Sequence, residues 1–120
     1  MIAHYSEVVN NCTKVPVIVS SDIENGPETA VKNTGRYPHH MALSACDDVD
    51  LTKKIASVTA KICRKNGVHW TYSPVVDINY NFQNPECNVR GFSDDPNHVI
   101  KIASAFIDGA EENGYLITTC

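Results

Sequence analysis

The sequence predicts an α/β fold in which parallel strands alternate with helices. Two long segments carry apolar residues at the spacing of an amphipathic helix, and each is followed, after one glycine, by a run rich in β-branched and aromatic residues. A third such run stands near the start of the chain. This alternation is typical of a parallel sheet covered by helices. With 120 residues, the chain is long enough for one domain and too short for two.

The first third of the chain contains one short amphipathic stretch and one β-rich run. Ile2–Val9 is weakly amphipathic and predicts a helix. Val15–Ser20 is a nearly continuous apolar run and predicts the first strand. The next segment, Ser21–Pro38, shows neither helical nor strand periodicity, so we expect a long loop there.

Asp47–Asn66 predicts the first long helix. Asp48 or Asp50 is placed to cap its start, and Gly67 is placed to end it. Apolar side chains recur in this segment at spacings of four, three and four, so we expect one buried face made of Leu51, Ile55, Val58 and Ile62.

The rest of the chain repeats this design. Val68–Tyr72, continued by Val75–Asp77, predicts the second strand, and Asp77–Asp94 predicts a second long loop. Asp95–Asn113 predicts the second long helix, and Tyr115–Thr119 the last strand. The helix is expected to have Asp95 as its cap, Pro96 in its first turn, a stop at Gly114, and a buried face of Val99, Ile102, Phe106 and Ala110.

Composition excludes several classes of protein. The chain has 10 Lys and Arg residues against 14 Asp and Glu, a net charge of −4, which gives no electrostatic reason to expect nucleic acid or an anionic membrane as partner. No apolar run is long enough to span a bilayer. Met1–Ser6 shows no signal peptide, which favours a cytoplasmic location for a chain that begins there. Five cysteines without a C-x-x-C pair predict reduced thiols.

The two long loops are the expected ligand site. Both follow strands, and parallel α/β folds bind ligands at the carboxyl ends of their strands. No phosphate-binding glycine motif follows a strand, and the histidines show no metal-ligand spacing, so no cofactor or metal is expected. A solvated or packing role is expected for His39, His40, His69 and His98. Carboxylates, amides and an arginine beside aromatic residues favour a neutral polyhydroxyl ligand. The loop residues considered as candidates to contact it are Asp22, Glu24, Asn25, Asp77, Asn79, Asn81, Asn84 and Arg90.

Three ordered motifs carry a resemblance to a known family. Val17–Gly26 reads V-I-V-S-S-D-I-E-N-G, Tyr37–Leu43 reads Y-P-H-H-M-A-L, and Pro74–Asn79 reads P-V-V-D-I-N, followed by Asn84-Pro85 and by R-G-F-S-D-D-P at Arg90–Pro96. These segments resemble the D-x-E-x-G, F-P-x-x-M-A-L and P-V-x-D-x-N … N-P … R-S-F-G-x-D-P motifs of glycoside hydrolase family 3. The resemblance implies that residues 1–120 are a fragment of the family's N-terminal (β/α)8 barrel, a partial barrel of roughly three βα units.

Two departures from the family pattern matter. The arginine segment has its glycine directly after Arg90, whereas the family has it two residues later. Ungapped counting from Gly114 puts Cys120 at the family's lysine position, so the chain either ends one residue early or lacks that lysine. The family's nucleophile and acid/base follow later in the barrel or beyond it. The resemblance therefore implies no catalytic residue in this chain.

The resemblance also implies roles for four loop residues. Asp22 is expected to accept hydrogen bonds from sugar hydroxyls, with a turn or helix-cap role as the alternative. Arg90 is expected to hold hydroxyls or a neighbouring carboxylate with its planar fork of donors. Glu24 is expected to support its loop. Asp77 is expected to accept backbone N–H bonds of its own loop, as carboxylates at strand ends commonly do, with a direct contact with the substrate as the alternative. A catalytic pair of Glu24 with Asp22 or Asp77 is rejected because the family's nucleophile lies elsewhere.

The function implied is that of a portion of a retaining exo-glycosidase, which hydrolyses terminal non-reducing β-linked sugars by a covalent two-step route. The sequences I-E-N-G-P at Ile23–Pro27 and N-x-N at Asn79–Asn81 most resemble the β-N-acetylhexosaminidase branch. A β-glucosidase or β-xylosidase is the alternative within the family, and a non-catalytic carbohydrate-binding remnant is the alternative from another class. The 120 residues alone are expected to be inactive.

Overall fold

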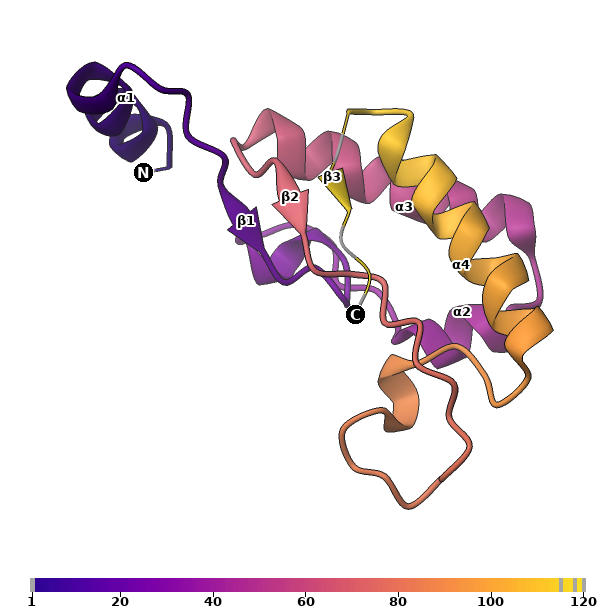
Figure 1. The fold of residues 1–120 in the computed structure, drawn as a ribbon. Coiled ribbons are helices and arrows are strands. Elements are labelled where there is room, and N and C mark those ends of the chain that lie inside the picture. Colours follow the sequence, from indigo (N-terminus) through magenta and orange to yellow (C-terminus); the bar gives the residue numbers. More distant parts are fainter. Residues whose placement is uncertain (1, 115, 118, 120) are drawn as a thin grey trace.

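The computed structural model describes residues 2–114, 116–117 and 119. Within them, helices alternate with three very short strands (Figure 1). The elements are α1 (Ile2–Thr13), β1 (Ser20–Ser21), the 3-10 turn η1 (Pro27–Thr29), α2 (His40–Cys46), α3 (Val49–Lys65), β2 (Trp70–Thr71), the 3-10 turn η2 (Asn88–Arg90), α4 (Pro96–Glu111) and β3 (Leu116–Ile117).

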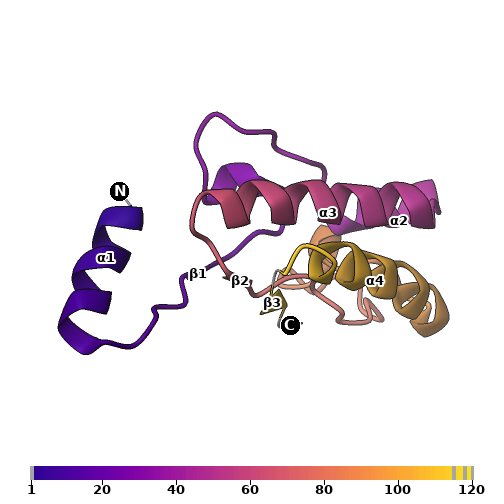
Figure 2. The same ribbon diagram turned by 90° about the horizontal axis from the view of Figure 1, so that it is seen from above.

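The strands form one parallel sheet in the order β1-β2-β3. Ser20 and Ser21 pair with Trp70 and Thr71, and these two pair in turn with β3. Because α3 connects β1 to β2 and α4 connects β2 to β3, the predicted alternation of parallel strands and helices is confirmed. Helices α3 and α4 lie side by side, whereas α1 lies at the opposite end of the molecule from α2 (Figures 1 and 2). Across the described residues, no helix has the length and apolar character needed to cross a membrane.

The paired part of each strand is shorter than predicted. Of the predicted strand Val15–Ser20, only Ser20 is paired, and Ile18 is 57% exposed. Strand pairing starts late because the β2 segment lies beside the first strand only from Val19 onward. The Val19 carbonyl accepts hydrogen bonds from the backbone N–H groups of His69 and Trp70 at 2.8 and 3.2 Å. The predicted continuation Val75–Asp77 has no strand partner among the described residues, although Val75 is buried. Of the predicted last strand, Tyr115 and Thr118 lie outside the described residues.

The predicted helix caps are confirmed. The Asp48 carboxylate accepts a hydrogen bond from the Leu51 backbone N–H at 2.9 Å at the start of α3. The Asp95 carboxylate accepts one from Asn97 at 3.0 Å at the start of α4. Such caps satisfy backbone donors that have no partner inside the helix. Gly67 has a φ of +82°, a left-handed conformation that ends α3.

The buried face of α3 differs from the prediction. Leu51 and Val58 are 39% and 37% exposed, so the predicted stripe is wrong for these two residues. The residues of α3 that are buried are small or polar, namely Thr52, Ala56, Thr59, Ala60 and Cys63. The reason lies in α4, which approaches closely at Gly109, where an added Cβ would overlap the Lys53 backbone. Such a close approach admits only small side chains between the helices. On α4, the predicted Val99, Ile102, Phe106 and Ala110 are all buried.

We expect Gly109→Ala to destabilise the fold by about 1–3 kcal/mol, because the added methyl group meets rigid backbone rather than a side chain that can move. The comparison is with Ser104→Ala on the exposed side of α4, which should change the free energy of unfolding by less than about 0.5 kcal/mol. Denaturant unfolding of both variants in the same protein background measures the difference. Equal midpoints for the two variants would show that the helices can separate at little cost.

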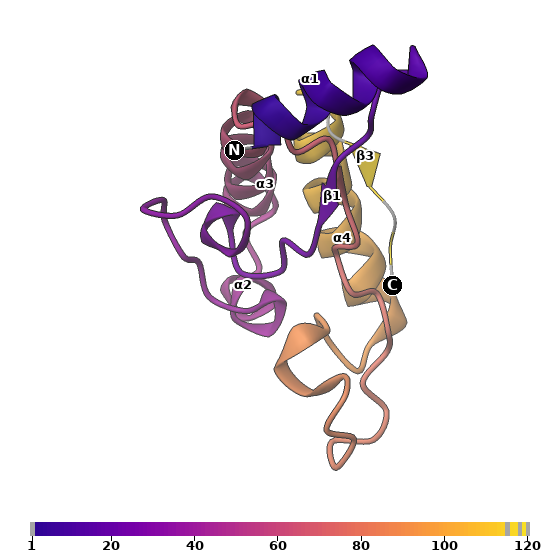
Figure 3. The same ribbon diagram turned by 90° about the vertical axis from the view of Figure 1, so that its left-hand side faces the viewer.

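Two buried side chains anchor the long loops in the core. Ile23, in the loop after β1, and Phe92, in the loop before α4, are each 2% exposed and belong to one apolar cluster with α3 and α4. Glu24, next to Ile23, and Arg90, two residues before Phe92, are therefore held close to the hydrophobic core. In Figure 3, β1 is drawn in front of α4, and the loop after it runs toward α2 and α3.

Candidate functional site

The site forms where the loop after β1 meets the loop before α4. Glu24, one residue beyond the buried Ile23, lies against Arg90, the last residue of η2. The two residues are 66 positions apart in the sequence. The fold therefore joins two of the four predicted residues in direct contact.

The contact between Glu24 and Arg90 is bidentate. Arg90 Nε donates to Glu24 Oε2 at 2.9 Å, and Nη2 donates to Oε1 at 2.6 Å. A further donor, Nη1, bonds the Glu86 carbonyl at 3.0 Å. The Glu24 side chain is 17% exposed and the Arg90 side chain 41%. Paired, charge-assisted bonds of this kind fix the plane of the guanidinium.

The electrostatics favour an ionised Glu24. The hydrogen bonds from Arg90 hold the pKa of Glu24 below its ordinary value of 4.5, although partial burial acts in the opposite direction. A carboxyl group whose pKa is lowered by folding contributes stability above its unfolded pKa and loses it as the pH falls through the folded one. The pair is therefore intact near neutral pH.

We expect acid to open this contact. Below about pH 4.5 the stability contributed by Glu24 should decrease, and in Glu24→Gln this part of the pH dependence should vanish. Carbon-13 NMR of the Glu24 carboxyl group follows its titration, and denaturant unfolding from pH 3 to 6 follows the stability. A Glu24 pKa at or above 4.5 would contradict the lowered pKa.

Among the described residues, the carboxylates of the other two predicted residues, Asp22 and Asp77, form no hydrogen bond or ion pair with one another or with the Glu24–Arg90 pair. Asp22 directly follows β1 and is exposed. Within the described part of the chain, its carboxylate has no hydrogen-bond or ion-pair partner. Asp77 is also exposed, and the predicted bonds between its carboxylate and its own loop are not found among the described residues. The backbone carbonyl of Asp77 instead faces the Cys87 thiol at 3.9 Å.

His40 belongs to the site, although the sequence predicts only a solvated or packing role for it. It begins α2, is 1% exposed, and places Nδ1 2.8 Å from the Arg90 carbonyl oxygen. Its ring stacks on Phe92 at 4.8 Å and meets the edge of Phe106 at 5.4 Å. The expected packing role of His40 is thus confirmed, and the expected solvated role is not. The polar contact has no sequence signal because the partners are 50 residues apart.

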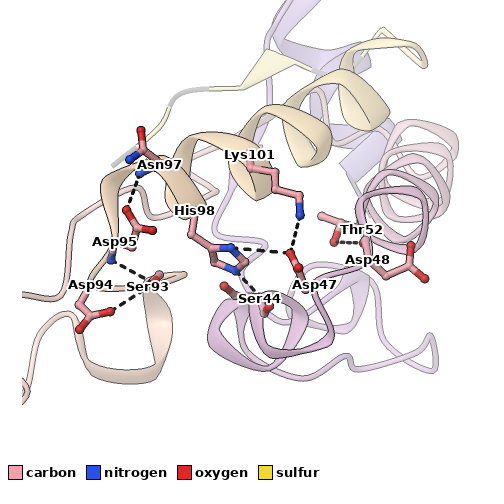
Figure 4. Close-up of polar contacts among 10 residues, drawn as sticks. All are labelled: Ser44, Asp47, Asp48, Thr52, Ser93, Asp94, Asp95, Asn97, His98 and Lys101. Atoms are coloured by element: carbon pink, nitrogen blue, oxygen red, sulfur yellow. Dashed lines mark hydrogen bonds and ion pairs between the residues drawn. The ribbon is translucent and has the colours of Figure 1, made fainter.

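A second polar cluster ties α2 and α3 to α4 (Figure 4). Asp47, between α2 and α3, accepts a hydrogen bond from Lys101 Nζ at 2.7 Å. His98 of α4 donates from Nε2 to the Ser44 carbonyl at 3.2 Å, and its Nδ1 is 3.7 Å from the Asp47 carboxylate. The bond from Lys101 lowers the pKa of Asp47. This cluster holds the C-terminal end of α2 in place, and His40 stands at the other end of the same helix.

Among the described residues, no group of three or more His, Cys, Asp or Glu side chains could hold a metal ion. The described cysteines are not joined in disulfides: Cys12 and Cys46 are exposed, and Cys63 and Cys87 are buried. Cys120, at the expected lysine position, lies outside the described residues.

The geometry is that of a parallel α/β domain with polar loops at the carboxyl ends of its strands. The chain belongs to glycosyl hydrolase family 3, because the model of that family's N-terminal domain matches residues 1–120. The resemblance read from the loop motifs is thereby confirmed.

Three relatives illustrate the match. A β-N-acetylglucosaminidase/β-glucosidase of Cellulomonas fimi is 31% identical over 100 residues, which are 83% of this chain and 18% of that protein. β-Hexosaminidase A of Pseudoalteromonas piscicida is 31% identical over 110 residues, 87% of this chain and 18% of that protein. The structure of a family 3 β-N-acetylglucosaminidase from Paenibacillus sp. str. FPU-7 superposes with a TM-score of 0.91 at 27% identity, over 99% of this chain and 23% of that one. The chain therefore spans about a fifth of the length of these relatives.

Proposed function

We propose that this chain is part of the catalytic barrel of a glycoside hydrolase that removes terminal β-linked sugars. The observation that carries the proposal is the exposed Asp22 carboxylate, which follows β1 without a protein partner in the described residues, in a chain of family 3. A carboxylate with both oxygens open is suited to accept hydrogen bonds from two sugar hydroxyls. The three parallel strands are then a portion of a (β/α)8 barrel.

In this proposal Arg90 is the second sugar-binding residue. Glu24 and the Glu86 carbonyl set the plane of its guanidinium, so the group is presented to a sugar hydroxyl at a defined angle. Glu24 then acts on Arg90 rather than on the sugar. The reaction is the retaining one, with a covalent glycosyl intermediate formed on a nucleophile outside these 120 residues.

We propose a terminal N-acetyl-β-hexosamine as the substrate. The names of the three relatives support it, since each includes a β-N-acetylglucosaminidase or a β-hexosaminidase. The Cellulomonas fimi protein is also named a β-glucosidase. A β-glucoside is accordingly the alternative substrate, and a β-xyloside the next.

Aryl glycosides test the proposal on the complete protein that carries this chain. We expect release of 4-nitrophenol from the N-acetyl-β-glucosaminide faster than from the β-glucoside. If 4-nitrophenol is released faster from the β-glucoside or the β-xyloside, the substrate is that glycoside instead of the N-acetyl-β-hexosaminide. Binding of N-acetylglucosamine without turnover would indicate a carbohydrate-binding remnant instead.

The 120-residue chain alone is expected to hydrolyse neither substrate and to self-associate. Among the described residues, β1 and β3 each have a neighbouring strand on one side only, and unpaired edges promote association. Size-exclusion chromatography and the same assay test both expectations. Turnover by the isolated chain would place a nucleophile among its own carboxylates, and a monodisperse, cooperatively melting monomer would show that the open edges are tolerated.

A further inference from the structure

We propose that His40 is a positioning residue that fixes Arg90 from the backbone side, while Glu24 fixes it from the guanidinium side. Arg90 is thereby held at both of its ends by side chains from other elements: α2 and the loop after β1. The inference rests on the proposed function for its kinetic effect and on geometry alone for its structural effect.

The hydrogen bond to the Arg90 carbonyl determines which ring nitrogen of His40 carries the proton. A carbonyl oxygen only accepts hydrogen bonds, so the 2.8 Å contact requires that His40 Nδ1 carries the proton and donates it to Arg90. Nε2 is buried and has no hydrogen-bond partner among the described residues. His40 is therefore the neutral Nδ1–H tautomer, oriented by one directed bond.

The packing prevents the ring from turning. Phe92 lies against one face of the His40 ring with 22° between the planes, and Phe106 meets it edge-on at 75°. Phe92 is only two residues after Arg90, so His40 touches the same short turn through a hydrogen bond and through a stacked ring. Gly91, between them, is also confined, because a Cβ there would lie 2.8 Å from Cys87 Sγ. The turn has little space in which to shift while His40 is in place.

Charge on His40 would disturb this arrangement. Burial lowers the pKa of His40 below 6.5, and the charged or titratable groups that act on it are Glu24, Arg90 and His39. Protonation would place a second N–H in the apolar contact with Phe92 and Phe106, where the described residues offer no acceptor. The neutral ring is the form that holds Arg90.

Two substitutions separate the hydrogen bond from the packing. His40→Asn keeps an N–H donor near the Nδ1 position and loses volume, whereas His40→Leu keeps similar volume and loses the donor. In the complete protein we expect His40→Leu to lower kcat/KM about tenfold or more, the size of one lost hydrogen bond, and His40→Asn to stay within about threefold. The acid limb of kcat/KM should change in both variants, since neither titrates. A role in packing alone predicts the opposite order, with Asn the more damaging, and would overturn the proposal.

Nitrogen-15 NMR separates this inference from the proposed function. The parent should show His40 protonated at Nδ1 and a slowly exchanging Arg90 Nε–H, and the Arg90 signal should exchange at least about tenfold faster in His40→Leu. Protonation at Nε2, or an unchanged Arg90 signal in His40→Leu, would overturn the positioning role. If the NMR results are as expected and the parent hydrolyses no β-glycoside, the positioning role stands and the proposed function fails.

Discussion

Asp22→Ala is expected to lower kcat/KM of the complete protein by about 30- to 1,000-fold, or about 2–4 kcal/mol. The reason is that a charged acceptor placed at the end of β1 would lose its bonds to the sugar hydroxyls. In the described residues Asp22 supports no other group, so the substitution should leave the free energy of unfolding within about 0.5 kcal/mol of the parent. Kinetics on the aryl N-acetyl-β-glucosaminide measure the first effect, and denaturant unfolding the second.

Two matched variants sharpen this experiment. Asp22→Asn keeps the shape and one acceptor oxygen, so its loss should lie between those of the parent and the alanine variant. Asp50→Ala removes another exposed aspartate, in the first turn of α3 and away from the loops, and should leave kcat/KM unchanged. An alanine variant at position 22 with kcat/KM within threefold of the parent would show that Asp22 does not bind the sugar.

Arg90→Lys is expected to lower kcat/KM by about 10- to 100-fold. An ammonium group keeps the charge but cannot bond both Glu24 oxygens in one plane and also reach Glu86. The lysine is therefore held less firmly, and under the proposed function its contact with the sugar is no longer at a fixed angle. Steady-state kinetics of the lysine variant on the same substrate measure the loss.

A double-mutant cycle with Glu24→Gln tests whether the pair acts as a unit. If Glu24 serves the sugar only through Arg90, the double variant should lose little more than Arg90→Lys alone. Arg36→Lys, at an exposed position, is the matched control for the change in side chain. Additive losses would assign Glu24 a separate contact with the substrate, and near-parental activity of Arg90→Lys would remove Arg90 from the site.

Local signals determined much of the architecture. Caps, stops and helical periodicity act over a few residues, so Asp48, Asp95 and Gly67 mark the ends of the two long helices in the sequence as in the structure. The parallel order of the strands also followed from the sequence, because a helix between two strands returns the chain in the same direction. The motifs of the loops, finally, identified the family.

Packing between elements decided the rest. Periodicity says which residues share a face of α3, but only the close contact with α4 at Gly109 determines that small residues face inward and that Leu51 and Val58 turn outward. The short ladder of β1 depends on where β2 lies beside it. Helix α2 is seven residues long, too short for a helical pattern to stand out, and was not predicted.

In the candidate site, too, some features follow from the local sequence and others depend on contacts between elements. The positions of Asp22, Glu24, Asp77 and Arg90 in loops after strands can be read from the sequence, because they depend only on the neighbouring β-rich runs. Contacts between distant elements determine that Glu24 pairs with Arg90 and that His40 donates a hydrogen bond to the Arg90 carbonyl, whereas the Asp22 carboxylate has no partner among the described residues. These contacts join residues 50 and 66 positions apart, and hydrogen bonds over such separations depend on how the core places the two loops. Ile23 and Phe92, which anchor both loops in one apolar cluster, are the physical reason that the contacts form.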